Sequence, residues 1–416
     1  MITFILSALK IIFLLGLLIL IHEAGHLLMA KWCKVRVNEF AIGFGPTIWK
    51  RQGKETKYAL RLIPLGGFCS MEGEEERSEQ KGSFSQASIP KRMAIVVAGA
   101  VVNIIFGLLV YFILMSCTGN YVTNIVNSTI EGYAAEEAGL QAEDKIIQID
   151  DRKINHQYDL KKAMDQNEGN EIKLTVERKG EKKELTVKPS EIKTKSTGMY
   201  LDEKAKIITV EKDSPAAKQG IEPNDKIIAI NGEKIEEDVN KALNIIHTPG
   251  LGTMLLTVQR GKTEVQIELT PNYLSTYYLG VNLKPAEDTW INHIIYGGIE
   301  TKTFAFSIID NLKQLFTGKV GVDQMMGPVG ISEAVAKTNG IQEFIYLLAL
   351  ISLSLGVTNL LPIPALDGGK ILILIIEAIR RKPMKQETEI NIQLLGFSIL
   401  IALSLYVTYN DILRIF

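Results

Sequence analysis

The segment from Ile11 to His26, IIFLLGLLILIHEAGH, joins an unbroken apolar run to three polar side chains at its end. Lys10 is the one charged residue between Ile2 and Ile21. A helix needs about 20 such residues to cross the hydrocarbon core of a bilayer. The segment therefore predicts a membrane-spanning helix. We expect this helix to be retained, because no small-residue cleavage site follows the apolar run.

Three more apolar runs are long enough to span a membrane as helices. A mean hydropathy of +0.12 coexists with 22% charged residues, which indicates that apolar and charged residues are segregated along the chain. The sequence thus predicts four spans and one large polar insert between the second and third. The runs are Met93–Cys117, Phe344–Leu361 and Ile392–Val407, and the insert extends from about Thr118 to Gln342.

The distribution of charge sets the expected orientation. The chain has 46 Lys and Arg against 47 Asp and Glu, a net charge of −1, which excludes a polyelectrolyte binder of nucleic acid. Basic residues lie between spans one and two and between spans three and four, and loops rich in them normally face the cytoplasm. We therefore expect both chain ends and the insert to face outside. These residues are Lys31, Lys34, Arg36, Lys50, Arg51, Lys91, Arg92, Arg380, Arg381, Lys382 and Lys385.

The insert contains an internal repeat. Three separated segments recur at one offset of 81 residues (220 − 139 and 225 − 144), which indicates two copies of one structural unit. Each copy reads as strand, short helix, strand, longer helix and hairpin. The matched pairs are Gly139-Leu140 with Gly220-Ile221, Asp144-Lys145-Ile146-Ile147 with Asp225-Lys226-Ile227-Ile228, and Arg178-Lys179-Gly180 with Gln259-Arg260-Gly261.

The order of these elements resembles PDZ domains of the circularly permuted kind found in bacterial envelope proteases. In the second copy, Ser214-Pro215-Ala216 stands ahead of Gly220-Ile221, as in such domains. PDZ folds bind extended peptides by adding a strand at a groove between a strand and a helix. The resemblance implies peptide C-termini as ligands of the two grooves. The alternative is a pair of spacer domains that bind nothing, because a fold alone does not establish a function.

The polar end of the first span has the spacing of a metal site. His22 and His26 are four residues apart, so on a helix they share one face and both can reach one ion. Glu23 lies beside them, where it can act as a general base toward water. Ionisable residues inside a membrane are costly and normally have partners. This setting favours a metal site over a polar cap at the membrane boundary.

A catalytic zinc ion usually takes three protein ligands, so a third is expected elsewhere. Asp367 closes the third apolar run in Asn359–Gly369, NLLPIPALDGG. Pro362 and Pro364 exclude a regular helix there, so we expect extended backbone that protein surrounds. Spans one and three run in the same direction and place Asp367 at the depth of the two histidines. The alternative role of Asp367 is to cap the following helix, Gly368–Ile379.

Together these features resemble the site-2 protease family of intramembrane zinc metalloproteases. The resemblance rests on His22-Glu23-Ala24-Gly25-His26, on Leu366-Asp367-Gly368, and on PDZ domains between spans two and three, and it covers nearly the whole chain. It implies one Zn²⁺ ion held by His22, His26 and Asp367, with Glu23 as a catalytic residue. The implied fold class is a multi-span α-helical membrane protein with four transmembrane helices, a membrane-associated β-hairpin and two tandem α+β PDZ domains.

The expected segments follow from this resemblance. Residues 286–342 resemble the family's amphipathic linker helices, which lie along the outer membrane surface. The other segments are transmembrane helix 1 with the zinc motif (1–30), a cytoplasmic loop with a membrane-reentrant hairpin (31–92), transmembrane helix 2 (93–117), PDZ domain 1 (118–197), PDZ domain 2 (198–285), transmembrane helix 3 with the Leu-Asp-Gly motif (343–369), a cytoplasmic helix and loop (370–391) and transmembrane helix 4 (392–410).

The resemblance also implies roles for two asparagines. Asn359 would lie near the scissile bond, where its amide can hold the substrate backbone or the oxyanion as a catalytic group. The Gly99-x-x-x-Asn103 motif of the second span would bring Asn103 close to the site and to the substrate. The alternatives are that Asn359 only satisfies backbone groups freed by Pro362, and that Gly99 only permits close helix packing.

Two alternating, glycine-bounded runs after the first span can pair as a β-hairpin and resemble the family's membrane-reentrant hairpin. Cleavage of a transmembrane helix requires its backbone to unwind and find new hydrogen-bond partners. We expect the hairpin edge to supply them by strand addition, with Gly43, Phe44 and Gly45 in contact with substrate. The alternative is a packed cytoplasmic hairpin without substrate contact. The two runs are Asn38–Pro46 and Tyr58–Phe68.

The sequence therefore predicts a zinc endopeptidase that cuts the transmembrane segments of single-span proteins in regulated intramembrane proteolysis. The resemblance implies anti-sigma-factor-like substrates and remnant signal peptides, and a place in the bacterial inner (cytoplasmic) membrane with the PDZ domains and both termini extracytoplasmic. The expected partners are these substrates and the lipid bilayer. The competing interpretation is a membrane-anchored adaptor that gathers peptide C-termini in its PDZ grooves and carries a vestigial metal site.

Overall fold

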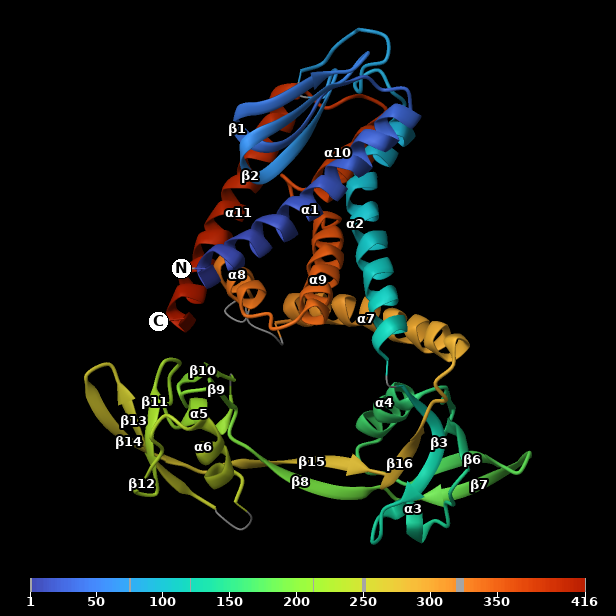
Figure 1. Cartoon of the computed structure of the whole chain (residues 1–416), viewed down its shortest axis with the longest axis vertical. Coiled ribbons are helices and arrows are strands. Elements are labelled where there is room, and N and C mark those ends of the chain that lie inside the picture. Colours follow the sequence, from blue (N-terminus) through green and yellow to red (C-terminus); the bar gives the residue numbers. More distant parts are fainter. Residues whose placement is uncertain are drawn as a thin grey trace. The chain divides into compact units, whose positions relative to one another are not determined.

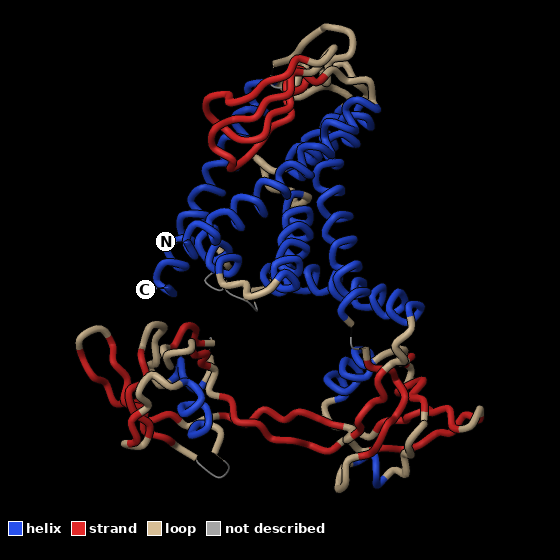
Figure 2. Tube along the Cα trace, in the orientation of Figure 1, coloured by secondary structure: helices blue, strands red, loops and turns tan. Residues whose placement is uncertain are grey.

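The computed structural model describes residues 2–74, 76–119, 121–211, 213–248, 252–318 and 325–415. The chain divides into two compact units, a helical unit of residues 1–119 and 293–416 and a β-rich unit of residues 120–292. Long helices and a small sheet make up the first unit, whereas strands dominate the second (Figures 1 and 2).

Four helices in the described part of the chain are long and apolar enough to cross a membrane. This confirms the four spans predicted from the apolar runs. The first helix continues past its apolar run and carries both histidines before it ends at Trp32. The four helices are α1 (Ile2–Trp32), α2 (Ile89–Thr118), α9 (Ile341–Asn359) and α11 (Gln386–Ile415).

α2 packs against both α1 and α9 within the helical unit. It approaches α9 closely because glycines lie at the crossing. A Cβ atom at Gly107 would lie 2.8 Å from the carbonyl oxygen of Ala349, and one at Gly356 would lie 2.7 Å from that of Ala100. Small residues allow helices to pack backbone to backbone in lipid, where apolar burial gives no drive for association. α2 is therefore the central helix of the unit.

The helical unit also contains α7 (Trp290–Phe316), α8 (Pro328–Ala336) and α10 (Asp367–Arg380). α8 is held at both ends. In the first turn of α8, the N–H of Gly330 donates a hydrogen bond of 2.8 Å to the Asp411 carboxylate of α11. The Lys10 ammonium of α1 donates to the carbonyl oxygen of Thr338 at 3.0 Å just beyond its end. Both charges suit the helix dipole, so Lys10 of the first span stabilises α8.

β1 (Val37–Gln52) and β2 (Lys57–Met71) form an antiparallel sheet after α1. Both strands are bent at glycines with positive φ, which are 87° at Gly43, 84° at Gly45 and 110° at Gly66. The bends allow residues 39–42 of β1 to pair with residues 67–70 of β2 as well as with residues 57–60. They also lay the end of β2 against α1.

The β-rich unit contains two lobes with separate apolar cores and the same order of elements. A two-stranded ribbon of β8 (Ser190–Ser196) and β15 (Asn272–Tyr278) joins them. Lobe 1 contains β3 (Val122–Thr129), α3 (Ala134–Glu137), β4 (Lys145–Ile149), β5 (Arg152–Lys153), α4 (Gln157–Asn167), β6 (Ile172–Arg178), β7 (Glu181–Val187) and β16 (Val281–Pro285). Lobe 2 contains β9 (Met199–Leu201), β10 (Ile207–Val210), α5 (Pro215–Lys218), β11 (Lys226–Ile230), β12 (Glu233–Lys234), α6 (Val239–Ile246), β13 (Met254–Arg260) and β14 (Thr263–Leu269).

Lobe 2 is inserted into lobe 1. β16 follows lobe 2 in the chain, yet it pairs with β3 in the sheet ordered β16-β3-β4-β6-β7. The corresponding strand of lobe 2 is β9. It is the first strand of that lobe in the chain, and it pairs with β10. Equivalent glycines with positive φ, Gly280 and Gly198, stand before these two strands. Residues 281–285, which the sequence assigned to the second domain, therefore complete the sheet of the first.

The repeated aspartate has the same role in both lobes. Asp144 is buried and takes two hydrogen bonds of 2.6 Å from the guanidinium of Arg178. Asp225 takes bonds of 2.8 and 2.7 Å from Arg260. The sequence offset placed Arg178 opposite Gln259, so the second lobe has one extra residue before its arginine. Each pair links the residue just before one strand (β4 or β11) to the last residue of its neighbour in the sheet (β6 or β13).

Breaking one pair should loosen only its own lobe. Burial raises the pKa of Asp144, but hydrogen bonds from Arg178 and from the Gln141 N–H outweigh burial and hold this pKa below its usual value. We expect Asp144→Asn to destabilise lobe 1 by about 1–3 kcal/mol at pH 7. The difference should shrink as the pH falls through the lowered pKa, because the wild-type carboxylate is then protonated as well.

Amide hydrogen exchange of the full-length protein in detergent checks this prediction. Peptides covering β4 and β6 should exchange faster in Asp144→Asn, whereas Asp225→Asn should affect β11 and β13 instead. Equal loosening of both lobes by either variant would contradict two independent cores.

Candidate metal centre

The three predicted ligands meet in the helical unit. His22 and His26 lie one turn apart on α1, and Asp367 is the first residue of α10. The two Nε2 atoms are 3.2 Å apart, and Asp367 Oδ2 lies 3.4 Å from that of His22 and 3.6 Å from that of His26. Among the described residues, these form the one group of three or more His, Cys, Asp or Glu side chains close enough to hold a metal ion.

The triangle of donor atoms fits a tetrahedral zinc ion. Bonds of about 2.0–2.1 Å at tetrahedral angles separate ligand atoms by about 3.3–3.4 Å, close to the three separations found here. Asp367 Oδ2 is buried and has no hydrogen-bond partner among the described residues. A buried carboxylate oxygen without a partner is costly unless a cation binds it. The three residues therefore fit zinc and leave a fourth position for water or substrate.

α2 orients the His26 ring. Nδ1 of His26 lies 2.9 Å from the carbonyl oxygen of Ile95, so Nδ1 carries the proton and donates it to that oxygen. This bond leaves Nε2 unprotonated and directed toward Asp367. A hydrogen bond of this kind on the second ring nitrogen is typical of metal-binding histidines.

Asn103 of α2 makes the corresponding contact to His22. Its side chain is fully buried, with Nδ2 placed 3.5 Å from His22 Nδ1 and Oδ1 without a partner. The two ends of an amide have nearly the same shape, so the group can equally turn Oδ1 toward the ring. Oδ1 can then accept the Nδ1 proton, beside the backbone hydrogen bond that His22 makes with Gly99, and His22 Nε2 is free for a metal ion.

Two glycines create the space for the histidines. A Cβ atom at Gly99 of α2 would lie 2.4 Å from His26 Nε2 and 2.9 Å from His22 Cε1. A Cβ atom at Gly25 of α1 would lie 2.6 Å from the carbonyl oxygen of Ala98. All three distances are far below van der Waals contact, so a larger residue would displace a ring or separate the helices. Gly99 does permit close packing, and this packing shapes the site.

Residues 360–366 carry the chain from α9 to Asp367. They form turns, in which the N–H of Ile363 donates to Leu361 and the N–H of Leu366 donates to Ile363. The expectation of extended backbone is wrong here, because proline, which excludes helix, is equally suited to turns. Leu366 occupies the N-cap position of α10. Asp367 therefore does not cap the helix and faces the histidines.

A cavity of about 270 Å³, the metal cavity, opens at the three ligands. Glu23 lines it beside the histidines. Gly67 of β2 packs close by, where an added Cβ atom would lie 3.4 Å from Glu23 Cγ. The strand approaches Glu23 this closely because residue 67 has no side chain. The other lining residues are Phe68, Cys69, Ser70, Met71, Glu74, Val96 and Lys370.

The other predicted site residues lie outside this lining in the described part of the chain. Asn359 is the last residue of α9 and is half-buried. Gly43, Phe44 and Gly45 lie at the bend of β1, where the half-exposed Phe44 ring covers Gly66. Their roles in substrate binding stay predictions.

Sequence reasoning missed Glu74, Cys69 and Lys370 as residues of the metal cavity. Lys370 stands three residues after Asp367, so on a helix the two share a face, and this spacing was an available signal. Glu74 lies in the charge run after β2, where no local pattern separates it from solvated neighbours. Cys69 is one of the apolar residues of a strand.

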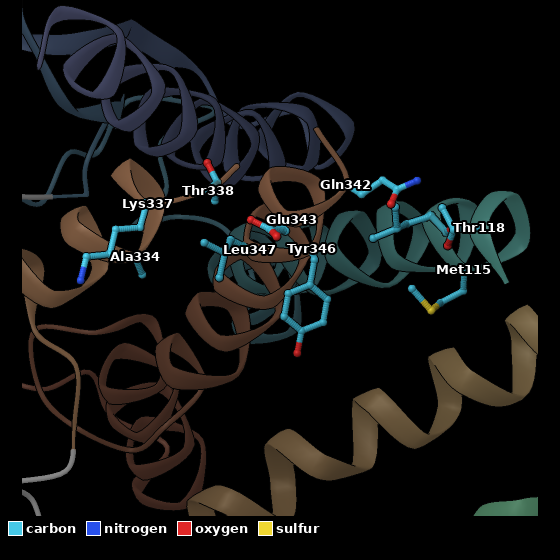
Figure 3. A pocket seen from close by; sticks show the side chains of 10 residues that line it. Met115, Thr118, Ala334, Lys337, Thr338, Gln342, Glu343, Tyr346 and Leu347 are labelled. Carbon is cyan, nitrogen blue, oxygen red and sulfur yellow. The ribbon is translucent and has the colours of Figure 1, made fainter. Parts of the chain in front are cut away.

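A different cavity of about 530 Å³ lies where α2, α8 and α9 meet (Figure 3). Its polar groups belong to Thr118, Lys337, Thr338, Gln342, Glu343 and Tyr346. Its described lining contains no histidine or cysteine and shares no residue with the metal cavity.

Comparison with known proteins gives a consistent result. The chain matches the model of peptidase family M50 over residues 10–403. A protein of Streptococcus pyogenes serotype M3 is 33% identical over 99% of this chain and 100% of its own length. The zinc metalloproteases RasP of Bacillus licheniformis and Geobacillus kaustophilus are 29% and 30% identical over 99% of this chain and 99% and 98% of their own lengths.

Among solved structures, the HtrA3 PDZ domain bound to a phage-derived ligand is 18% identical, with a TM-score of 0.19, and covers 21% of this chain and 93% of that chain.

The family match includes both the histidine motif and the aspartate that meet at the metal centre. The chain therefore belongs to peptidase family M50, the site-2 protease family that its sequence motifs predicted.

Proposed function

We propose that the protein is an intramembrane zinc endopeptidase that cleaves the membrane-spanning segments of single-span proteins. The observation that carries this proposal is the triangle of His22, His26 and Asp367 donor atoms, with Glu23 in the same cavity. The triangle lies among helices that are long and apolar enough to span a membrane. Family membership supports the same activity.

The residues of the centre divide the chemistry between them. His22, His26 and Asp367 would hold the ion, and zinc bound there would supply a Lewis acid for the scissile carbonyl and for water. Glu23 takes a proton from the attacking water and returns it to the leaving nitrogen. Ile95 and Asn103 keep both imidazole rings oriented through their Nδ1 atoms.

The substrate backbone is proposed to pair with the end of β2. Among the described residues, segment 67–71 pairs with residues 37–42 of β1 on one side, and its side chains at 68–71 line the metal cavity. A substrate strand added at the other edge would run along that cavity and satisfy its unwound backbone. The proposed clamp is therefore segment 67–71 of β2. Gly43, Phe44 and Gly45, the residues expected from the sequence, form the bend of β1 instead.

The hairpin is proposed to dip into the bilayer. Large apolar side chains around the bends of the hairpin are exposed. Their exposure to water would be unfavourable. A membrane surface would bury them and would bring the sheet edge to the depth of the substrate. These side chains are Phe44, Ile48, Trp49, Leu62 and Ile63. Asn359 remains a candidate to hold the substrate carbonyl or oxyanion once a substrate is bound.

The two lobes are proposed to be tandem PDZ domains on the extracytoplasmic side, acting as a size filter. A small cavity of about 150 Å³ in lobe 2 lies between β9 and α6, where Met199, Leu201, Leu243 and Ile246 suit an apolar C-terminal residue. The filter would admit segments whose exported domain another protease has removed. Anti-sigma-factor-like proteins and remnant signal peptides of a bacterial inner membrane fit this requirement.

Purified protein should contain about one zinc ion per chain, and Asp367→Ala should lose most of it because two imidazoles alone hold zinc weakly. Glu23→Gln should keep the ion but cleave at least about 100-fold more slowly, since general-base catalysis contributes that much. Metal analysis and cleavage of a fluorescent single-span reporter check both outcomes. Metal-free wild-type protein would favour the PDZ adaptor with a vestigial metal site.

Asn103→Leu removes the amide that faces His22 Nδ1 at nearly constant volume. We expect it to weaken zinc affinity about 10–100-fold, as loss of a second hydrogen bond to a ligand histidine usually does. Chelator competition measures this affinity. Unchanged zinc affinity together with slower cleavage would instead assign Asn103 to substrate contact.

Gly67→Val places a branched side chain where an added Cβ atom already lies 3.0 Å from the Ala41 carbonyl oxygen and 3.1 Å from Ile19 Cγ2. It should displace segment 67–71 and slow reporter cleavage by about tenfold or more, because small displacements at a reacting centre have large effects. Zinc content should be retained, and Gly67→Ala should have a smaller effect. Parallel loss of zinc and cleavage would show that the hairpin only supports the metal centre.

A further inference from the structure

Two cavities of the helical unit share one wall. Beside the metal cavity lies a larger one of about 660 Å³, which we call the loop cavity. It is bounded by the chain after β2, by α10 and by the first turns of α11. Among the described residues, Glu74 and Lys370 line both cavities and no other residue does. A solute that passes directly between the two cavities has to pass this pair.

Glu74 and Lys370 close the wall as an ion pair. Lys370 Nζ lies 2.7 Å from Glu74 Oε1, and their side chains are 41% and 17% exposed. The Lys370 side chain is the more exposed of the two, so its ammonium can leave Glu74 and still reach solvent. Lys370 lies one turn after Asp367 on α10, which places its ammonium beside the ligand set.

Part of the remaining described lining of the metal cavity is apolar packing. Val96, Cys69 and Met71 belong to the apolar core beneath the hairpin. Passage through such packing would strip a cation of its hydration shell at high cost. The loop cavity has a different lining, because carboxylate and amide oxygens can replace lost water ligands along it. These oxygens belong to Glu76, Gln386, Glu389 and Gln393, and Arg77 and Arg92 also line the cavity.

We propose that the Glu74–Lys370 pair is a gate through which the zinc ion enters and leaves the metal cavity by way of the loop cavity. This inference rests on the zinc centre of the proposed function. In the closed pair, the Lys370 ammonium stands in the path and repels a divalent cation. When the pair opens, the Glu74 carboxylate becomes available to the passing ion. The gate thus slows exchange of the ion with the loop cavity.

A gate and a purely electrostatic role predict opposite effects when Lys370 loses its charge. Removing a positive charge beside the ligands strengthens their hold on a cation, so electrostatics alone slows zinc release. Opening the wall speeds both release and uptake. Lys370→Met, which is unbranched and uncharged, separates the two possibilities.

The test mixes zinc-loaded, full-length protein in detergent with an excess of a hydrophilic chromogenic chelator and records zinc release over time. Lys370→Met should release zinc about fivefold faster or more, because a larger fraction of molecules has the wall open. Its metal-free form should take up zinc faster, with unchanged zinc content at equilibrium. Lys370→Arg keeps the pair and should resemble the wild type. Lys57→Met, which breaks the 3.0 Å pair with Glu39 on the hairpin, is the matched control.

Cys69 provides a second measurement, which uses an uncharged reagent. It lines the metal cavity and is absent from the described lining of the loop cavity. With Cys33 and Cys117 replaced by alanine, Lys370→Met should speed modification of Cys69 by uncharged N-ethylmaleimide. This variant decides, because burial and nearby carboxylates, Glu74 among them, raise the pKa of the Cys69 thiol, so Glu74→Gln speeds modification on that ground alone.

Slower zinc release from Lys370→Met, or unchanged release and unchanged Cys69 modification in that variant, would overturn the gate. Loss of zinc content in Lys370→Met would also overturn it and make Lys370 a positioning residue for the ligands. A third outcome is that Lys370→Met speeds zinc exchange, whereas the wild-type protein binds zinc but cleaves no single-span reporter. This outcome would overturn the proposed function and leave the gate standing. A wild-type protein that takes up no zinc would overturn both.

Discussion

The close contact between α1 and α2 at Gly25 and Gly99 is the constraint on which the metal centre depends. Both histidines of α1 rest on the backbone of α2 at Gly99, where no side chain intervenes. The same helix supplies the Ile95 carbonyl and the Asn103 amide that face their Nδ1 atoms. One helix therefore makes room for the two rings and also sets their orientation.

The third ligand reaches the centre through the same helix. α9 packs on α2 at Gly107 and Gly356, and the turns after α9 deliver Asp367 to the start of α10. Those turns lie directly on α10, where a Cβ atom at Gly368 would be 2.1 Å from the Leu361 carbonyl oxygen. Glycine at this position is thus a packing requirement. All three ligands are positioned relative to α2, which explains how segments more than 300 residues apart form one site (367 − 26).

The nested lobes give the β-rich unit a specific connection to the rest of the chain. β3 follows α2 and β16 precedes α7, and Val122 pairs with Pro285 in the sheet of lobe 1. Both connections to the helical unit therefore leave from neighbouring strands of one sheet. β16 can join β3 in this sheet only after the chain has passed through the whole of lobe 2. Closing so long a loop has an entropic cost.

Local patterns determined the four spans, the two histidines with Glu23, the aspartate and the repeat. Each of these depends on residues within a few helical turns or at one fixed offset, which a sequence displays directly. Tertiary structure decided that β16 joins lobe 1, that Asn103 faces His22, and that Glu74 and Lys370 separate two cavities. These features depend on contacts between segments far apart in the chain. Local spacing can place Asn103 and Lys370 near the site, but it does not name their distant partners, which packing selects.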